Sequence, residues 1–166
     1  PLSYTSLTML ESPPTGGDTI YVDMEEAYKR LSPRFQKMLE GVEAIHSSVE
    51  QVSASRSFGG IGRREGVETA HPVARTHPVT GKKSLYINQQ FTRRLVGFKN
   101  EESDAILKLL FDHITQSTDF SLRASWEENT TVFWDNRKLN HSAVSDWDLV
   151  GEYRRHAFRL GARGER

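Results

Sequence analysis

The sequence predicts a mainly β protein, a jelly-roll-like β core with a few helices packed outside it. Several short segments rich in β-branched and aromatic residues are separated by glycine- and proline-containing turns. Only a few segments have the 3.6-residue apolar spacing of an amphipathic helix, and no internal repeat is visible. Short strands with interspersed helices favour this architecture. With 166 residues, the chain is long enough for one domain, residues 1–166, with a substantial core.

The N-terminal quarter begins with two predicted strands. Residues 2–10 contain threonine and aromatic side chains suited to a strand, residues 13–18 (PPTGGD) form a turn, and residues 19–22 resume as a short strand. A helix is expected at 23–31. A second helix is expected to start with Ser32 as its N-cap and a proline at its first position.

Residues 52–68 carry no periodic pattern and are rich in glycine, serine and arginine. Their glycines lack the preceding strand, spacing and lysine of a phosphate-binding loop. We expect a mobile loop within the domain, because unstructured loops of this length usually serve a function or are disordered. Such a loop could act as a lid.

The second half of the chain contains the most regular helix pattern. Residues 101–115 place Ile106, Leu109, Leu110, His113 and Ile114 at core spacing, and Asn100 is a candidate N-cap. This long helix could also supply the interface of a homo-oligomer. A turn at 78–81 (PVTG) joins two of the remaining predicted strands. Those strands are 71–76, 84–88, 120–126, 130–134 and 153–160.

Composition excludes several functional classes. The 22 basic and 22 acidic residues balance, so nothing indicates binding to nucleic acid. The sequence has no cysteine, which excludes disulfides, thiolate metal sites and cysteine nucleophiles and leaves His, Asp and Glu as metal ligands. No apolar run reaches the roughly 20 residues of a membrane span, and the first residues lack signal-peptide features. A cytoplasmic enzyme fits these properties.

His141 is the first candidate site residue. It follows the apolar strand 132–134 after a polar segment that could bring its imidazole to the rim of a barrel. Neutral imidazole is a common ligand for iron, copper, nickel and zinc, although a lone histidine is often a structural hydrogen-bonding residue. Asp135 and Asp146 flank His141 and could orient an imidazole or an arginine, or could simply belong to turns.

Arg155 and Arg159 form a candidate anion site. Side chains alternate along a strand, so positions 155, 157 and 159 would share one face, with the small Ala157 between the two arginines. Planar guanidinium groups bind carboxylates and sulfonates well. The alternative is a solvated edge strand in a basic tail. Thr19, where a turn enters a strand, could donate its hydroxyl to a ligand oxygen or cap the turn.

Four separated motifs occur in one order: Pro14–Thr19 (PTGGDT), His71–Gly81 (HPVARTHPVTG), Trp134–Arg137 (WDNR) with His141, and the two arginines. Together they make the sequence similar, from about residue 1 to about residue 160, to the taurine/alkylsulfonate dioxygenase family. Members are Fe(II)- and 2-oxoglutarate-dependent oxygenases. Within the family the sequence most resembles the fungal sulfonate dioxygenases.

The resemblance implies a double-stranded β-helix that holds Fe(II) through a His-x-Asp pair and a later histidine. His141 matches that histidine, Arg155 the arginine that pairs with the 2-oxoglutarate carboxylate, and Thr19 the threonine that helps hold it. Arg159 matches the arginine that meets the substrate sulfonate. The interval from His141 to Arg155 is slightly longer here than in bacterial members of the family. Arg154, one residue closer to His141, is therefore a rival for the role of Arg155. The implied reaction hydroxylates a small sulfonate and gives aldehyde, sulfite, succinate and CO2.

One departure concerns the iron site. No His-x-Asp or His-x-Glu occurs in the sequence, and in the family that pair precedes the segment matching residues 2–10. We therefore expect the C-terminal portion of a longer enzyme, with the alternative of a homologue that lacks the iron site. A non-catalytic jelly-roll module that binds an anion through its arginines is the alternative function.

Overall fold

The structure is a computed structural model that describes residues 2–60, 64–147 and 153–164. The chain divides into two compact units. The first consists of Pro1–Glu26 with Ser117–Arg166, and the second of Ala27–Gln116. All four predicted site residues belong to the first unit.

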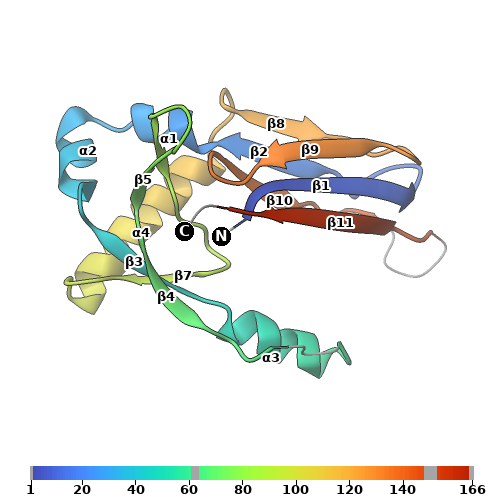
Figure 1. The fold of residues 1–166 in the computed structure, drawn as a ribbon, viewed down its shortest axis with the longest axis horizontal. Coiled ribbons are helices and arrows are strands. Elements are labelled where there is room, and N and C mark those ends of the chain that lie inside the picture. Colours follow the sequence, from blue (N-terminus) through green and yellow to red (C-terminus); the bar gives the residue numbers. More distant parts are fainter. Residues whose placement is uncertain (1, 61–63, 148–152, 165–166) are drawn as a thin grey trace. The chain divides into compact units, whose positions relative to one another are not determined.

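The first unit is built from two three-stranded antiparallel sheets, with strand orders β11-β1-β9 and β10-β2-β8 (Figure 1). From β8 onward each successive strand lies in the other sheet, the alternation typical of a jelly roll. This arrangement confirms the predicted jelly-roll core. The strands are β1 (Leu2–Glu11), β2 (Thr19–Asp23), β8 (Ser121–Ala124), β9 (Thr131–Asp135), β10 (Leu139–Ala143) and β11 (His156–Arg163).

Alternation along the strands sets which side chains face the space between the two sheets. Thr5 and Met9 of β1 and Trp134 of β9 are buried, whereas Tyr4 and Phe133 stack on the outer face with ring centroids 5.4 Å apart. Tyr21 of β2 contacts Trp134 edge to face, with ring centroids 5.4 Å apart. The two inner faces therefore meet through aromatic side chains.

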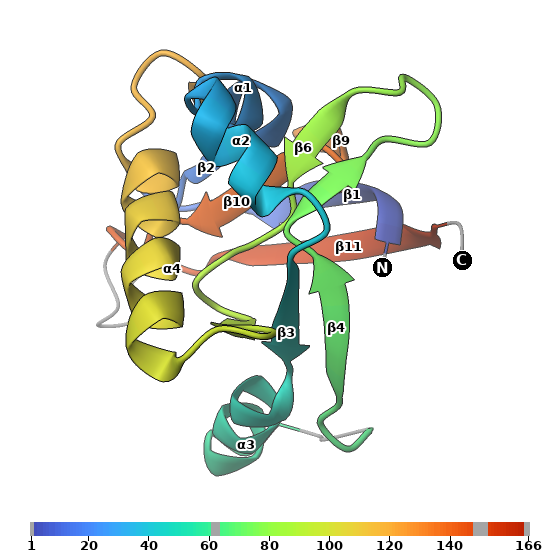
Figure 2. The same ribbon diagram turned by 90° about the vertical axis from the view of Figure 1, so that its left-hand side faces the viewer.

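The second unit combines a three-stranded antiparallel sheet, of order β4-β3-β7, with a β5-β6 hairpin and helices (Figure 2). Its buried side chains include Leu39, Leu85, Leu95 and Leu110. The strands are β3 (Glu43–Ser47), β4 (Glu68–Pro72), β5 (Ala74–Thr76), β6 (Lys83–Leu85) and β7 (Thr92–Leu95). The helices are α2 (Pro33–Leu39), α3 (Val49–Ser57) and α4 (Asn100–Thr115). The helix α1 (Met24–Lys29) contains the chain position, after Glu26, at which the first unit ends and the second begins.

The predicted cap of α2 is confirmed, whereas α1 begins one residue later than expected, at Met24. Ser32 Oγ accepts a hydrogen bond from the backbone N–H of Phe35, with Pro33 as the first residue of α2. Before α1, Asp23 Oδ1 accepts from the backbone N–H groups of Glu25 and Glu26. These contacts end β2 and turn the chain into the helix.

The start and the buried face of α4 differ from the sequence prediction. Asn100 is the first helical residue rather than the N-cap, because the carboxylate of Glu102 accepts the backbone N–H of Lys99 and makes Lys99 the cap. Leu110 is fully buried, but Leu109 is 49% exposed. The buried stripe runs through Ser103, Leu107, Leu110 and Ile114.

The segment predicted as a loop at 52–68 begins as a helix. The helix α3 covers Val49–Ser57, has no buried residue, and is continued by a turn in which Gly60 N donates to Ser55 O. Its polar and small side chains give it no apolar stripe, so periodicity could not reveal it. Residues 61–63 of the predicted loop lie outside the described residues.

Other strand boundaries also differ. The segment predicted as one strand at 71–76 is divided between β4 and β5, which belong to different sheets, and β3, β7 and β10 were not predicted because they are short and carry polar residues. The last strand begins at His156 rather than Tyr153. No helix in the described part of the chain is long and apolar enough to cross a membrane.

Candidate active site

His141 lies on β10 and faces the space between the two sheets of the first unit. It pairs with Tyr21 on β2, and paired residues on neighbouring antiparallel strands point to the same side of a sheet. From the opposite sheet the indole of Trp134 approaches the imidazole, with ring centroids 5.0 Å apart and planes inclined by 62°. The histidine is therefore held between two aromatic rings while one side stays open to solvent.

The protonation state of His141 suits a metal ligand. Neighbouring protein atoms displace water from its ring, and the positive charge of Arg159 adds to this effect, so the pKa of His141 is lowered. The imidazole is therefore neutral at pH 7, as metal binding requires. Its backbone N–H donates to Asn140 Oδ1, and in the described chain no hydrogen bond occupies either ring nitrogen.

Asn136 fixes the indole that packs on His141. Its side-chain oxygen accepts the Nε1–H of Trp134 at 2.9 Å, and its side-chain nitrogen donates to Thr5 Oγ1 at 2.8 Å. Thr5 is buried in β1, so the indole is tied to the centre of its sheet. The WDNR motif thus sets the orientation of Trp134, a role that its spacing alone did not reveal.

Arg155 is anchored directly before β11. Its Nε donates to Gly17 O at 3.0 Å, and its guanidinium lies 5.5 Å from the ring centroid of Trp147. Its charge acts on Tyr21, where it opposes the effect of burial, which raises the pKa of Tyr21 to about 12. In the described chain the terminal amino groups of Arg155 have no hydrogen-bond partner, so they remain available to an anion.

Arg159 reaches the same site from β11. It pairs with Leu7 of β1, a position on the inner face. Its positive charge contributes to the lowered pKa of His141. The prediction that Arg155 and Arg159 share one strand face is wrong in detail, because Arg155 precedes the strand and the pairing register shifts between Met9 and Glu11. Both arginines nevertheless reach residues of the inner face.

Arg154, the rival for Arg155, lies elsewhere. Its side chain is 69% exposed and pairs with Glu11 at 3.2 Å. This position favours Arg155 as the anion-binding residue of the pair.

Thr19 is buried on β2, two residues before Tyr21 and on the same face. Its Oγ1 accepts the indole N–H of Trp126 at 3.1 Å. Since this bond occupies a lone pair of the hydroxyl oxygen, the hydroxyl proton is free to be donated to a ligand oxygen.

The site is electropositive. The positive charge of Arg155 acts on the buried Tyr21 and that of Arg159 acts on His141. The hydroxyl of Tyr21 has no hydrogen-bond partner among the described residues. The described residues contain no group of three or more His, Cys, Asp or Glu side chains that could hold a metal. The arrangement can thus supply one metal ligand and bind two anionic groups.

Of the roles predicted for the two aspartates that flank His141, the structure shows contact with an arginine in both cases. The carboxylate of Asp135 accepts hydrogen bonds from the guanidinium of the buried Arg137 at 2.8 and 2.7 Å and from its backbone N–H at 2.9 Å. Asp146 accepts the backbone N–H of Gly17 at 2.7 Å and pairs with Arg123 at 2.8 Å. Neither contact involves the imidazole.

Sequence reasoning missed Tyr21 and Trp147 as parts of the site. Tyr21 could have been found, because it lies two residues after Thr19 on the same strand. Trp147 lies in a loop, where no periodicity indicates direction.

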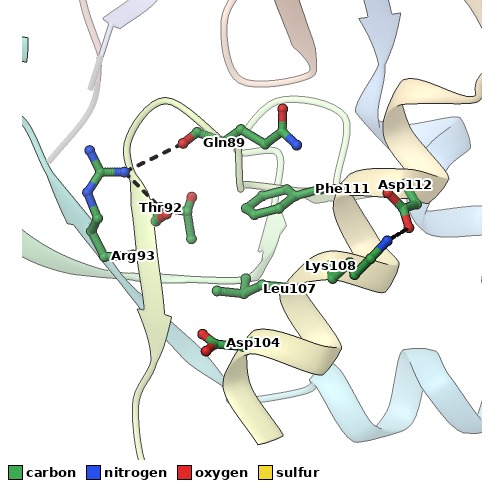
Figure 3. A pocket seen from close by; sticks show the side chains of 8 residues that line it. All are labelled: Gln89, Thr92, Arg93, Asp104, Leu107, Lys108, Phe111 and Asp112. Atoms are coloured by element: carbon green, nitrogen blue, oxygen red, sulfur yellow. Dashed lines mark hydrogen bonds and ion pairs between the residues drawn. The ribbon is translucent and has the colours of Figure 1, made fainter. Parts of the chain in front are cut away.

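A pocket in the second unit is unrelated to these residues. It is lined by side chains from α4 and from β7 and the segment before it, and its cavity measures about 220 Å³. In Figure 3 the guanidinium of Arg93 points away from the aromatic ring of Phe111, toward the backbone near Gln89. The pocket contains none of the predicted site residues.

Comparison with known proteins identifies the family of the chain. Residues 1–160 match the family model described as "Taurine catabolism dioxygenase TauD, TfdA family". The chain is 45% identical over 166 residues to the alpha-ketoglutarate-dependent sulfonate dioxygenase of Saccharomyces cerevisiae, covering all of the chain and 40% of that protein. It is 48% identical over 163 residues to the alpha-ketoglutarate-dependent dioxygenase cnsP of Penicillium expansum, covering 96% of the chain and 44% of that protein.

Solved structures show the same architecture. A taurine dioxygenase from Burkholderia xenovorans superimposes with a TM-score of 0.84 at 30% identity, covering 99% of this chain and 53% of that one. AAD-2 in complex with Mn(II) and N-oxalylglycine gives 0.83 at 26% identity, covering 100% and 65%. The chain spans less than half the length of the two fungal relatives, 40% and 44%. The chain belongs to the TauD, TfdA family of taurine catabolism dioxygenases.

Proposed function

We propose that the full-length protein is an Fe(II)- and 2-oxoglutarate-dependent dioxygenase that hydroxylates a small sulfonate. The observation that carries this proposal is the gathering of His141, Arg155 and Arg159 around the space between the two sheets. The names of the fungal relatives support 2-oxoglutarate as co-substrate, and one of them supports a sulfonate as substrate.

His141 fits the role of an iron ligand. It is neutral at pH 7, and its ring nitrogens are open in the described part of the chain. A site of two histidines and one carboxylate suits Fe(II) and leaves positions for co-substrate and O2. The described residues contain no group of three or more His, Cys, Asp or Glu side chains, so they do not complete such a site by themselves. Iron, when bound, supplies the activation of O2 and the oxidative decarboxylation of 2-oxoglutarate to succinate and CO2.

Arg155 and Thr19 would hold 2-oxoglutarate. The Nε of Arg155 already donates to Gly17 O, which leaves its two terminal amino groups. These two groups can bind a carboxylate through two parallel hydrogen bonds. The Thr19 hydroxyl can donate a third bond, since its oxygen accepts from Trp126. These contacts fix the end of the co-substrate that is remote from the metal.

Arg159 would bind the substrate sulfonate. It is the inner-face cation whose charge reaches His141, so an anion paired with it would lie near the metal ligand. Pairing there would hold the carbon next to the sulfonate on the side of His141. Hydroxylation of that carbon gives a product that breaks down to an aldehyde and sulfite. Tyr21 and Trp134 exclude water from this side of the site.

The test is sulfite release by the full-length protein. We expect sulfite and succinate in equal amounts with Fe(II), ascorbate, 2-oxoglutarate and at least one member of a panel of alkylsulfonates. His141→Ala should abolish both products. His156→Ala is the matched control, because His156 lies exposed at the start of β11 and pairs with Glu11 at 3.3 Å. No sulfite from any sulfonate, in a protein that consumes 2-oxoglutarate, would overturn the substrate class.

A further inference from the structure

The turn Gly16–Asp18 is held by the loop that follows β10. Asp146 Oδ1 accepts the backbone N–H of Gly17 at 2.7 Å, and the backbone N–H of Val144 donates to Asp18 O at 2.9 Å. Thus one side-chain bond and one backbone bond fix the turn to that loop.

Arg123 completes a charged network around the same turn. Its Nε donates to Asp18 Oδ2 at 2.6 Å, and its terminal nitrogen donates to Asp146 Oδ2 at 2.8 Å. One guanidinium therefore bridges the two carboxylates that frame Gly17. Because Asp146 uses one oxygen for Gly17 and the other for Arg123, its carboxylate cannot rotate without losing both bonds.

The Gly16–Asp18 turn, fixed in this way, holds Arg155. Gly17 O accepts the Nε–H of Arg155 at 3.0 Å, and the ring of Trp147, the residue after Asp146, lies against the same guanidinium. A continuous path of contacts thus leads from Arg123 through Asp146 and Gly17 to Arg155. With Nε fixed, the two terminal amino groups of Arg155 point in one set direction.

The close fit at both glycines shows how little freedom the turn has. A Cβ built on Gly16 would lie 2.8 Å from Asp146 O, and one on Gly17 would lie 2.9 Å from Arg155 Nε. Both residues have positive φ, 79° and 70°. A shift of the turn would therefore move the arginine as well.

We infer that Asp146 and Arg123 are positioning residues for the co-substrate site, which act through Gly17 to hold the guanidinium of Arg155 in the orientation that receives the remote carboxylate of 2-oxoglutarate. This inference rests on the proposed function. Neither residue touches the co-substrate itself. Their contribution is to the preorganisation of Arg155, which lowers the cost of binding rather than adding a contact.

The test is a calorimetric titration of the iron-loaded, full-length protein with 2-oxoglutarate in the absence of O2, together with KM and kcat of the same enzyme. Asp146→Ala should raise the Kd and the KM for 2-oxoglutarate about tenfold, equivalent to about 1.4 kcal/mol, while kcat stays within about twofold. Asp146→Asn keeps an oxygen acceptor for Gly17 but not the negative charge, so it should raise the Kd and the KM less than Asp146→Ala does. Arg123→Gln should shift both constants in the same direction.

Glu40→Ala is the matched control, because it removes a carboxylate paired with Lys83 at 2.7 Å on the surface of the second unit. It should leave both constants unchanged. A double-mutant cycle then separates positioning from a general loss of structure. In an Arg155→Ala background, Asp146→Ala should change the Kd less than about twofold, since its effect passes through the missing guanidinium.

The outcomes distinguish the two proposals. A wild-type protein that forms no succinate overturns the proposed function. A wild-type protein that forms succinate, with Asp146→Ala and Arg123→Gln both binding 2-oxoglutarate normally, overturns the positioning role alone. Equal losses from Asp146→Ala with and without Arg155 also overturn it, because the effect would then not pass through Arg155.

Discussion

The indole of Trp134 lies edge to face against the imidazole of His141, with ring centroids 5.0 Å apart. The two residues belong to different sheets, so this contact connects the sheets at the candidate metal ligand. The orientation of His141 therefore depends on how the opposite sheet holds Trp134. In this structure that task falls to Asn136.

Asn136→Ala should destabilise the protein by about 1–3 kcal/mol, because it leaves the indole N–H of Trp134 and the hydroxyl of Thr5 without their partners. Urea unfolding of the full-length protein measures this change. Asn136→Asp keeps the acceptor for Trp134 and should lose less stability. An Asn136→Ala protein as stable as wild type would show that the two bonds contribute nothing.

Gly17→Ala should weaken 2-oxoglutarate binding, because the added methyl group would lie 2.9 Å from Arg155 Nε and displace the guanidinium. Gly81→Ala is the matched control, since Gly81 has the same φ of 70° but open space around its Cα. Both variants should lose about 1–2 kcal/mol of stability from the backbone conformation. Only Gly17→Ala should raise the Kd, and equal binding by both variants would contradict the close fit.

Leu110→Ala should cost about 2–5 kcal/mol of unfolding free energy, because Leu110 is fully buried against the core of the second unit. Its neighbour Leu109 is 49% exposed, and Leu109→Ala should cost about 0.5 kcal/mol or less. Chemical denaturation of the two variants provides the comparison. Similar losses would mean that α4 is rotated relative to the structure.

The free energy of unfolding should decrease as the pH is lowered from about 6.5 to about 4, because of His46. Burial, with the nearby charges of His71 and Arg93, lowers the pKa of His46 from 6.5 to about 4. In this window the unfolded chain binds a proton that the folded protein does not, so stability rises with pH and is fully present above 6.5. After a discount for the partial solvent exposure of His46, which screens the charge, the loss at pH 4 is on the order of 2 kcal/mol.

Urea unfolding at pH 4.5 and pH 7 tests the His46 effect. His46→Gln should reduce the difference in stability between these pH values. It should not abolish the difference, because burial also lowers the pKa of His71, which packs edge to face on His46 with ring centroids 5.3 Å apart. An unchanged pH dependence in His46→Gln would exclude His46 as its cause.

The sequence predicted those elements whose signal is local. Ser32 and Pro33 start α2 as expected, because cap chemistry acts over three residues. The helix α3 and the short strand β10 were missed for physical reasons. The first has no buried face, and the second is a polar strand stabilised by its pairing with β2, which is distant in sequence.

The candidate site could be predicted only in part. His141, Thr19 and Arg155 were candidates from their residue types and positions, and the resemblance to a family gave their roles. The structure brings His141 and Thr19 onto one face of the β10-β2 pair. The links among Asp146, Gly17 and Arg155 could not be read from the sequence. They join residues more than 120 positions apart through a loop whose geometry no periodicity encodes.

The most direct test of the proposed site compares steady-state constants of Arg155→Ala and Arg159→Ala in the full-length enzyme. Arg155→Ala should raise KM for 2-oxoglutarate at least about tenfold and leave KM for the sulfonate nearly unchanged. Arg159→Ala should do the reverse, and its succinate production should no longer be matched by sulfite release. If both variants raise the same KM, or neither raises any, the assignment of the two arginines to two different anions is wrong.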